Sequence, residues 1–389
     1  MAALKALNAH GLGLDPVAAD WPALNADDVA TLLRGYGQVG VPLELTWHSP
    51  RPFSAACLVR TSTATVFVKR HHSRVRTSAW LLEEHRFMAY LQARGVPVSR
   101  VLANREGQTA VAQGEWTYEV HAAAEGHDLY RDALSWTPFL SEAQAWSAGA
   151  ALARLHRAAE GYQAPARRAE VLLANFKLLA GDDPAADLRT AVQRTPALAD
   201  YLGRHDWQDE LLPLLLPWHR ELQPRLARQA PLWTHNDWHG SNLLWNTVSD
   251  DAQVSGVLDF GLADRTFALF DLATAIERSC IPWLDLDSGG DAPAFLGQVD
   301  ALLAGYRSTR PLSADDISTL VALLPVAHVD FALSEVAYFQ GVVGSTASAD
   351  VAYHTYLIGH ARWFAGNQGQ ALLEHLRELA DPSSRSSRT

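Results

Sequence analysis

Three polar residues in two short segments have the types and the spacing that phosphoryl transfer requires. Asp237 and Asn242 belong to a segment with the order His-x-Asp, four residues, then Asn, and Asp259 opens an Asp-Phe-Gly sequence after an apolar run. Phosphoryl transfer needs one carboxylate near the attacking hydroxyl and two further oxygen ligands for Mg²⁺. Asp237 can act as that carboxylate, the catalytic base, and Asn242 and Asp259 can hold the metal.

The two segments resemble the catalytic loop and the metal loop of the aminoglycoside phosphotransferase family, kinase-like enzymes that also include choline, homoserine and fructosamine kinases. The resemblance spans about residues 25–278. It implies ATP and Mg²⁺ as cofactors and in-line transfer of the γ-phosphoryl group to a hydroxyl. Two departures stand out. Asn236 occupies a position where the family often has Gly, and the loop of residues 47–56, expected to cover the phosphates, has no glycine-rich pattern.

Lys69 and Glu84 are predicted to form the ion pair that aligns the phosphates of the nucleotide. Lys69 ends a β-branched and aromatic run, where a buried ammonium must find an anion. Glu84 falls on the same helical stripe as Leu81, Met88 and Leu91, and a carboxylate in an apolar stripe requires a partner. Taken alone, Lys69 would read as a solvent-facing lysine on an edge strand, and a rotated helix would leave Glu84 in water.

The resemblance also implies roles for residues around this centre. The backbone of Glu119 and His121, just before the helical part, is expected to bind the nucleotide base. His235 is expected to hold the catalytic loop, although His235 and His239 together could also be read as a transition-metal site. Asp271 is either a scaffold that accepts hydrogen bonds from the catalytic loop or an ordinary helix N-cap.

The pattern of elements predicts an α+β protein with a protein-kinase-like fold of two lobes. We expect a loose N-terminal extension over 1–24, a strand-rich, nucleotide-binding lobe over 25–121 and a helical lobe with the catalytic and acceptor-binding parts over 122–380. Residues 381–389 are polar and are expected to form a disordered tail.

The composition excludes several classes of protein. The chain has 389 residues, of which 48% are hydrophobic and 19% charged, as in an ordinary globular protein. A formal charge of −11 argues against nucleic acid as a partner, because phosphate-backbone binders carry a basic face. Two cysteines, Cys57 and Cys280, do not make a disulfide framework. We expect no membrane span and no signal peptide, and hence a cytoplasmic location.

The acceptor is expected to be a hydroxyl of a small molecule: an amino sugar, an amino alcohol, a sugar or an aminoglycoside. Trp283, Asp285 and Asp287 follow the core and could meet such an acceptor or form a surface loop with one packed Trp. A Ser/Thr protein kinase of the same shape, a nucleotide-binding pseudokinase and a slow ATP hydrolase are the alternatives. The chain shows no Ala-Pro-Glu segment after Asp259, and Asp271 follows too soon for a long protein-kinase activation segment.

Overall fold

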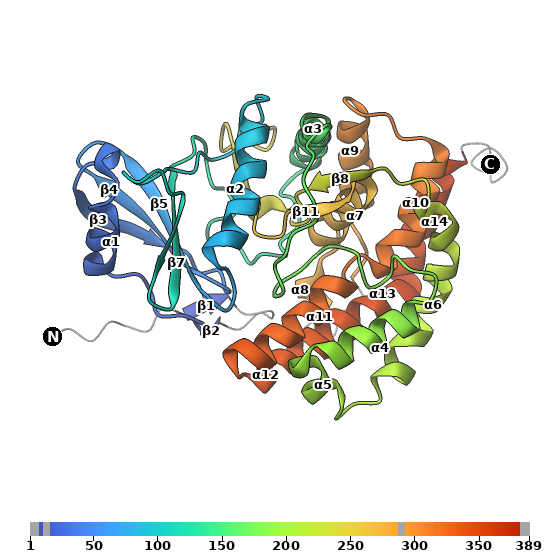
Figure 1. The fold of residues 1–389 in the computed structure, drawn as a ribbon. Coiled ribbons are helices and arrows are strands. Elements are labelled where there is room, and N and C mark those ends of the chain that lie inside the picture. The colour runs from blue at the N-terminus through green and yellow to red at the C-terminus, as the bar shows by residue number, and fades with distance from the viewer. Residues whose placement is uncertain (1–7, 11–15, 287–291, 382–389) are drawn as a thin grey trace.

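The computed structural model describes residues 8–10, 16–286 and 292–381, and it shows a strand-rich lobe beside a larger helical lobe (Figure 1). The predicted α+β fold of two lobes is confirmed. The predicted tail lies outside the described residues except for Asp381. The strands are β1 Asn8–His10, β2 Pro16–Ala18, β3 Pro42–His48, β4 Ala55–Thr61, β5 Thr65–His72, β6 Ala110–Gln113, β7 Trp116–Ala122, β8 Pro231–Thr234, β9 Leu243–Trp245, β10 Val254–Val257 and β11 Asp264–Phe267.

Five strands of the first lobe form one antiparallel sheet in the order β3-β4-β5-β7-β6. Side chains alternate between the two faces of a strand, so Val66 and Val68 point to the side opposite Lys69 and pack with Val59 and Val120. Helix α1 (Ala26–Leu33) adds Leu32 and Leu33 to this core, and Asn25 caps it as the sequence indicates. Between α2 and β6, residues 98–102 form only isolated bridges, at Val98 and Val101.

Helix α2 (Ser78–Gln92) lies between the sheet and the helical lobe. The stripe predicted from its sequence is buried: Leu81 and Leu91 are 0% exposed, and Glu84 and Met88 are 4% exposed. Thr77, one residue before the expected Ser78, is the N-cap and accepts a hydrogen bond from the Trp80 amide. Because Met88 and Leu91 belong to the core of the helical lobe, α2 is fixed to that lobe.

The second lobe consists of helices around the two-stranded ribbons β8–β11 and β9–β10. Its helices are α3 Glu142–Ala159, α4 Pro184–Arg194, α5 Pro196–Leu202, α6 Trp207–Leu226, α7 Ala268–Ser279, α8 Trp283–Leu286, α9 Leu296–Arg307, α10 Ala314–Leu323, α11 Val329–Tyr338, α12 Thr346–Asp350, α13 His360–Ala365 and α14 Asn367–Ala380.

Helix α6 continues through three prolines. Pro213, Pro217 and Pro224 all lie on its exposed side, where the carbonyls freed by the missing N–H groups can turn to water. The opposite stripe, including Leu211 and Leu215, is buried in the core. Burial of one face therefore outweighs the low helix propensity of proline on the other face.

Helices α3 and α9 approach each other closely because each has a glycine where the backbone of the other helix passes. A Cβ atom at Gly149 would collide with the Leu302 carbonyl, and one at Gly305 would collide with the Trp146 carbonyl. This close approach brings His156 of α3 to Tyr306 of α9, whose hydroxyl lies 2.8 Å from His156 Nδ1. The other ring nitrogen of His156, Nε2, lies 3.0 Å from the carboxylate of Asp271 in α7.

The end of the predicted loose extension is packed, so that boundary is wrong for its last residues. Leu24 is 2% exposed in the core of the sheet lobe, and Trp21 Nε1 donates to the Tyr338 hydroxyl at 3.1 Å. The same hydroxyl donates to Asp20 at 2.8 Å. Phe53, in the loop between β3 and β4, packs edge-on against the Tyr338 ring at 5.1 Å. This N-terminal segment thus fixes the β3–β4 loop to helix α11.

One apolar stretch, Ala314–Val343, does reach the length of a membrane span, so the expectation that no apolar run approaches this length is wrong. It is long and apolar enough by composition, but 89% of its most apolar window is buried inside the structure. Its helices α10 and α11 form the core of the helical lobe, so the apolar side chains have a partner other than lipid. Cys57 and Cys280 are both buried free thiols.

Candidate active site

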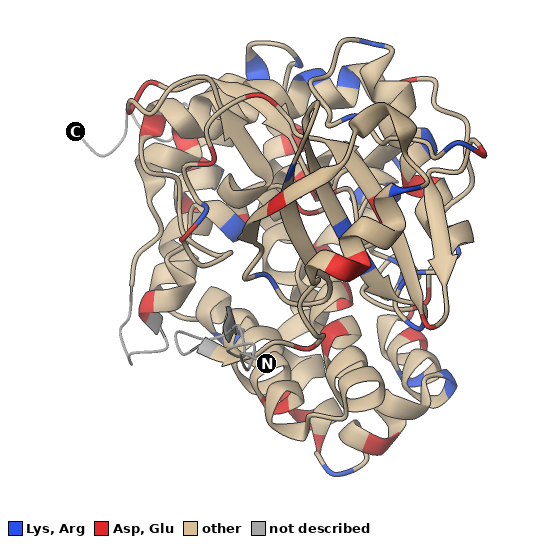
Figure 2. Cartoon of the chain, turned by 90° about the vertical axis from the view of Figure 1, so that its left-hand side faces the viewer, with Lys and Arg blue, Asp and Glu red and all other residues tan. Residues whose placement is uncertain are grey.

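Asp237, Asn242, Asp259 and Lys69 line one cleft between the lobes, with about 870 Å³ of open space including its mouth. Asp237 and Asn242 lie between β8 and β9, Asp259 follows β10, and Lys69 lies in β5. Residues 52–54 of the β3–β4 loop line the same cleft, where the phosphate-covering loop was expected. Acidic and basic residues are interspersed over the side shown in Figure 2.

The catalytic loop is held by a buried carboxylate beneath it. Asp271 of α7 accepts hydrogen bonds from the backbone N–H groups of His235 and Asn236, each at 2.8 Å. His156 Nε2 lies 3.0 Å from the same carboxylate. Asp271 is 0% exposed, so the scaffold interpretation holds and the N-cap interpretation does not. His235 in turn contacts the Leu258 carbonyl through Nε2 and accepts the Asp237 N–H through Nδ1, which links both loops.

Asn236 occupies a position where the backbone requires a left-handed conformation. Its φ is +61°, which glycine adopts freely and asparagine tolerates better than most residues. Its side chain is buried, accepts the Thr234 hydroxyl at 2.7 Å and donates to the Leu262 carbonyl at 3.2 Å. The departure from Gly therefore keeps the loop conformation and adds two hydrogen bonds that brace it.

Loss of the Asp271 charge is expected to destabilise the protein. In Asp271→Asn, the amide presents N–H groups to two backbone donors, so at least one buried N–H loses its partner. We expect the free energy of unfolding to fall by about 2–4 kcal/mol, measured by urea denaturation. Asp206→Asn is the matched control, because that exposed side chain forms no capping hydrogen bond. An equal change in both variants would contradict the scaffold role.

Asp237 is ionised because positive charge outweighs its burial. Burial alone would raise the pKa of this carboxyl, but the adjacent Arg278 guanidinium, with His239 second, lowers it below its ordinary value. Arg278 Nη1 forms a short ion pair with Asp237 Oδ1. The guanidinium also lies 4.8 Å from the centre of the Phe331 ring. Asp237 is thus a carboxylate that can accept a proton but does not hold one beforehand.

The orientation of Asn242 is fixed by hydrogen bonds from its amide nitrogen. Nδ2 donates to the Asp237 carbonyl and to Asp237 Oδ2, both at 2.9 Å, and lies 3.1 Å from His239 Nε2. The amide oxygen is therefore the part of Asn242 that remains for a metal ligand. Burial lowers the pKa of the His239 imidazole more than the nearby Asp237 charge raises it, and His239 Nε2 lies 3.4 Å from Asp237 Oδ1 in the same network.

Lys69 and Asp259 form an ion pair across the cleft. Lys69 Nζ lies 3.0 and 3.1 Å from the two Asp259 oxygens. Burial would lower the pKa of Lys69, but Asp259 and then Glu119 and Glu84 raise it, so the ammonium stays charged. Asp259 adopts a φ of +50°, and its Oδ1 accepts the Gly261 N–H at 3.2 Å. The donor set of one carboxylate and one amide oxygen suits Mg²⁺, which prefers hard oxygen ligands.

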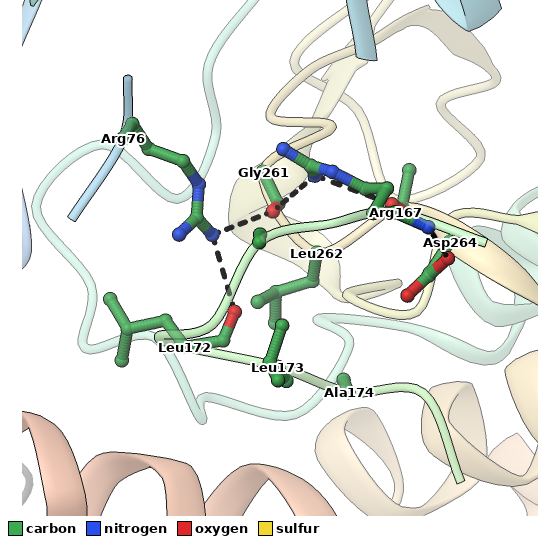
Figure 3. A pocket seen from close by; sticks show the side chains of 10 residues that line it. Arg76, Arg167, Leu172, Leu173, Ala174, Gly261, Leu262 and Asp264 are labelled. Atoms are coloured by element: carbon green, nitrogen blue, oxygen red, sulfur yellow. Dashed lines mark hydrogen bonds between the residues drawn. The ribbon is translucent and has the colours of Figure 1, made fainter. Parts of the chain in front are cut away.

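The predicted pairing of Lys69 with Glu84 is wrong for this structure. Glu84 instead lies 2.9 Å from Arg167 Nη2, and both side chains are at most 5% exposed. A guanidinium can serve several acceptors at once, and Arg167 also donates to the Gly261 carbonyl at 2.8 Å. Arg76 donates to the same carbonyl at 2.9 Å, as Figure 3 shows. The two arginines thus fix the metal loop, and Glu84 acts on it through Arg167.

Glu119 and His121 are placed differently from the prediction. Both lie within β7, and the backbone of Glu119 pairs with Lys69 on one side and Ala110 on the other. A strand paired on both edges cannot offer its backbone to a nucleotide base. The linker between the lobes therefore begins after Ala122. The Glu119 side chain is buried among three histidines.

Among the described residues just after α7, neither Trp283 nor Asp285 lines the cleft that holds Asp237. Trp283 is 4% exposed, stacks on His360 and donates to the Glu277 carbonyl. This agrees with the alternative prediction, a surface loop with one packed Trp. Asp285 is exposed. Asp287 lies outside the described residues.

Arg278 is the functional residue that the sequence did not reveal. It follows Asp271 by seven residues, which is two helical turns, so both project from one side of α7 toward the catalytic loop. That spacing is the only signal in the sequence, and the contact with Asp237 depends on the fold.

The comparisons with known proteins agree with this geometry. The model of the phosphotransferase enzyme family matches residues 52–312. An uncharacterized protein of Deinococcus radiodurans is 28% identical over 85% of this chain and 86% of its own length. The homoserine kinase of Gluconacetobacter diazotrophicus is 31% identical over 48% of this chain, and the match spans half of that kinase. A microcompartment-associated aminopropanol kinase has a TM-score of 0.59 at 18% identity, over 90% of this chain and 98% of its own.

Fold and site thus define a kinase-like phosphotransferase. The chain belongs to the phosphotransferase enzyme family, whose model covers 52–312 of its 389 residues.

Proposed function

We propose that the protein transfers the γ-phosphoryl group of Mg²⁺–ATP to a hydroxyl of a small molecule that carries an amine. The observation that supports this most is the convergence of Asp237, Asn242, Asp259 and Lys69 on one cleft. Such a site works by positioning and by charge stabilisation, since the phosphoryl group itself needs little covalent help.

Each residue has a distinct part in this proposal. Asp237 orients the acceptor hydroxyl and takes its proton as the oxygen attacks. Asn242 and Asp259 would hold Mg²⁺, which would neutralise charge on the phosphates. Lys69, now paired with Asp259, would turn to a phosphate oxygen once the metal takes its place at the carboxylate. His235 and Asp271 keep the catalytic loop in place for this chemistry.

The amine is inferred from a carboxylate in the wall of the cleft. Glu335 of α11 is 1% exposed and lines the cleft near Arg278. Among the described residues its Oε2 has no hydrogen-bond partner. Burial raises the pKa of this carboxyl well above its ordinary value, more than the nearby Arg278 charge lowers it. Trp136 and Phe331 line the same wall. A bound ammonium group would supply the positive charge that lets this buried carboxyl ionise, and the aromatic rings beside it suit the same cation.

The direct experiment measures phosphate transfer from labelled Mg²⁺–ATP to a panel of acceptors. The panel contains amino alcohols, amino sugars and aminoglycosides, each beside the matched alcohol that lacks the amine. We expect transfer to amine-bearing acceptors and little to their matched alcohols. Equal transfer to both would contradict the amine, and transfer to none but to a protein serine would contradict the small-molecule acceptor.

Glu335→Gln separates acceptor binding from nucleotide binding. Loss of a charged hydrogen bond costs about 1.5–3 kcal/mol, so KM for an amine acceptor should rise roughly 10- to 100-fold. KM for ATP should stay within about twofold, because Glu335 lies on the helical wall rather than near Lys69. A parallel rise for the matched alcohol without an amine would show that the variant disturbs the cleft in general.

A further inference from the structure

The side chain of Glu119 lies at the centre of three histidines from three different elements. His71 of β5, His85 of α2 and His121 of β7 point their Nε2 atoms at this carboxylate, at 3.0, 2.8 and 2.9 Å. The four side chains are all buried. One ring nitrogen each of His85 and His121 and one carboxylate oxygen of Glu119 lie within 4.8 Å of one another.

The sheet register explains why these groups meet. Lys69 is paired with Glu119, and residues two apart on a strand share a face, so His71 and His121 lie on the face that carries Lys69 and Glu119. Helix α2 contributes His85, the residue after Glu84. A sheet face under a helix is ordinarily apolar, and burying four titratable side chains there is costly unless they share a partner.

Unlike the nearby carboxylates Glu84 and Asp259, Glu119 has no arginine or lysine as its ion-pair partner in the described part of the chain. Glu84 is paired with Arg167, and Asp259 is paired with Lys69. Within the part of the chain that the structure describes, Glu119 forms ion pairs with histidines alone. Glu119 is thus a buried carboxylate held by imidazoles alone, and burying such a charge is costly unless a cation lies beside it.

We propose that His85, His121 and Glu119, with His71 beside them, form a binding site for Zn²⁺ or a similar transition metal. Imidazole nitrogen and one carboxylate oxygen are ligands that suit Zn²⁺ better than Mg²⁺, so this site differs in chemistry from the one at Asn242 and Asp259. Ligand atoms of a tetrahedral zinc site lie about 3.3 Å apart for bonds of about 2.05 Å. The distances of 2.8 and 2.9 Å from His85 and His121 to Glu119 Oε2 are within a few tenths of an ångström of that spacing, while His71 contacts the other oxygen, Oε1.

A second contact prepares one ligand for the metal. His85 Nδ1 lies 3.0 Å from Thr109 Oγ1. If Nδ1–H donates to that hydroxyl, the lone pair of Nε2 is left for the metal, which is the arrangement typical of zinc-bound histidine. The site would tie α2 to β5 and β7, so metal binding should stabilise the sheet lobe. This proposal does not depend on phosphoryl transfer, and its test uses no activity.

The test is metal binding by the full chain after treatment with a chelator. Titration with Zn²⁺ against a chromophoric competitor should give one ion per chain, and Co²⁺ should give the intense visible absorption of a tetrahedral site. At about 100-fold excess over Kd, Zn²⁺ should raise Tm by roughly 5 °C. A wild-type chain that binds no Zn²⁺, or binds Co²⁺ only with the weak spectrum of an octahedral ion, would overturn the proposal whatever the variants do.

Two variants locate the ion. Glu119→Gln and His121→Gln should each weaken Zn²⁺ binding at least about tenfold and abolish the Co²⁺ absorption. His354→Gln is the matched control, because His205, Asp350 and His354 form a second, more exposed cluster of possible ligands in the described chain. Binding that persists in Glu119→Gln and is lost in His354→Gln would assign the ion to the exposed cluster and overturn the proposal.

Discussion

Asp237→Asn is expected to lower kcat by about 10²- to 10⁴-fold while Mg²⁺–ATP still binds. The variant keeps the size of the side chain but removes the proton acceptor for the attacking hydroxyl. Because Asn242 and Asp259 remain, the metal ligands are unchanged. Initial rates over a range of acceptor concentrations, beside equilibrium binding of an ATP analogue, measure the two effects separately.

Two checks accompany this variant. Removing the Asp237 charge leaves Arg278 buried without its partner, so part of the loss could reflect stability, and thermal unfolding must be measured in parallel. Asp250→Asn, an exposed carboxylate after β9, is the control and should retain full activity. In the wild type, the lowered pKa of Asp237 means that it should cause no acid limb in kcat/KM above its ordinary value of 3.8. An equal loss of turnover and nucleotide binding would refute the assignment of Asp237 as base.

The local parts of this site could be predicted from the sequence because they depend on local spacing. Asp237 and Asn242 are five residues apart in one loop, and Asp259 follows a strand that pairs with the strand after that loop. Once the two-stranded ribbons form, the pairing of β9 with β10 places these three side chains close together. The scaffold role of Asp271 could also be anticipated, since α7 follows the metal loop closely.

The parts that depend on distant segments could not be predicted. Arg167 reaches Glu84 from a stretch without regular structure, 83 positions further along the chain, and no periodicity marks it. The histidines around Glu119 come from three elements, and they meet through the register of β5 with β7 and the packing of α2 on the sheet. The prediction that Lys69 pairs with Glu84 was wrong because a better donor for a buried carboxylate, a guanidinium, was available in the fold. Catalytic residues that lie together in one loop can therefore be predicted from the sequence, whereas the ion-pair partners of buried charges depend on the tertiary structure.

Asp259→Ala is expected to lower kcat/KM by roughly 10²- to 10³-fold and to raise the Mg²⁺ concentration needed for half-maximal rate. A metal ion contributes several kcal/mol of charge stabilisation, and loss of one of its ligands should forfeit about 3–4 kcal/mol of it. The measurement is the initial rate as a function of free Mg²⁺ at saturating ATP.

Lys69→Ala separates the role of the metal from that of the phosphate contact. Within the described part of the chain, Lys69 Nζ donates its hydrogen bonds to the two Asp259 oxygens. Removal of the lysine therefore frees that carboxylate for the metal. We therefore expect Lys69→Ala to reduce turnover and raise KM for ATP, yet to leave the Mg²⁺ requirement unchanged or slightly lower. Since Asp259→Ala should shift the Mg²⁺ requirement in the opposite direction, the two variants distinguish a metal ligand from a structural ion pair. If both variants left the Mg²⁺ dependence of the wild type intact, Asp259 would be only the partner of Lys69, and the metal would have to be held by other groups.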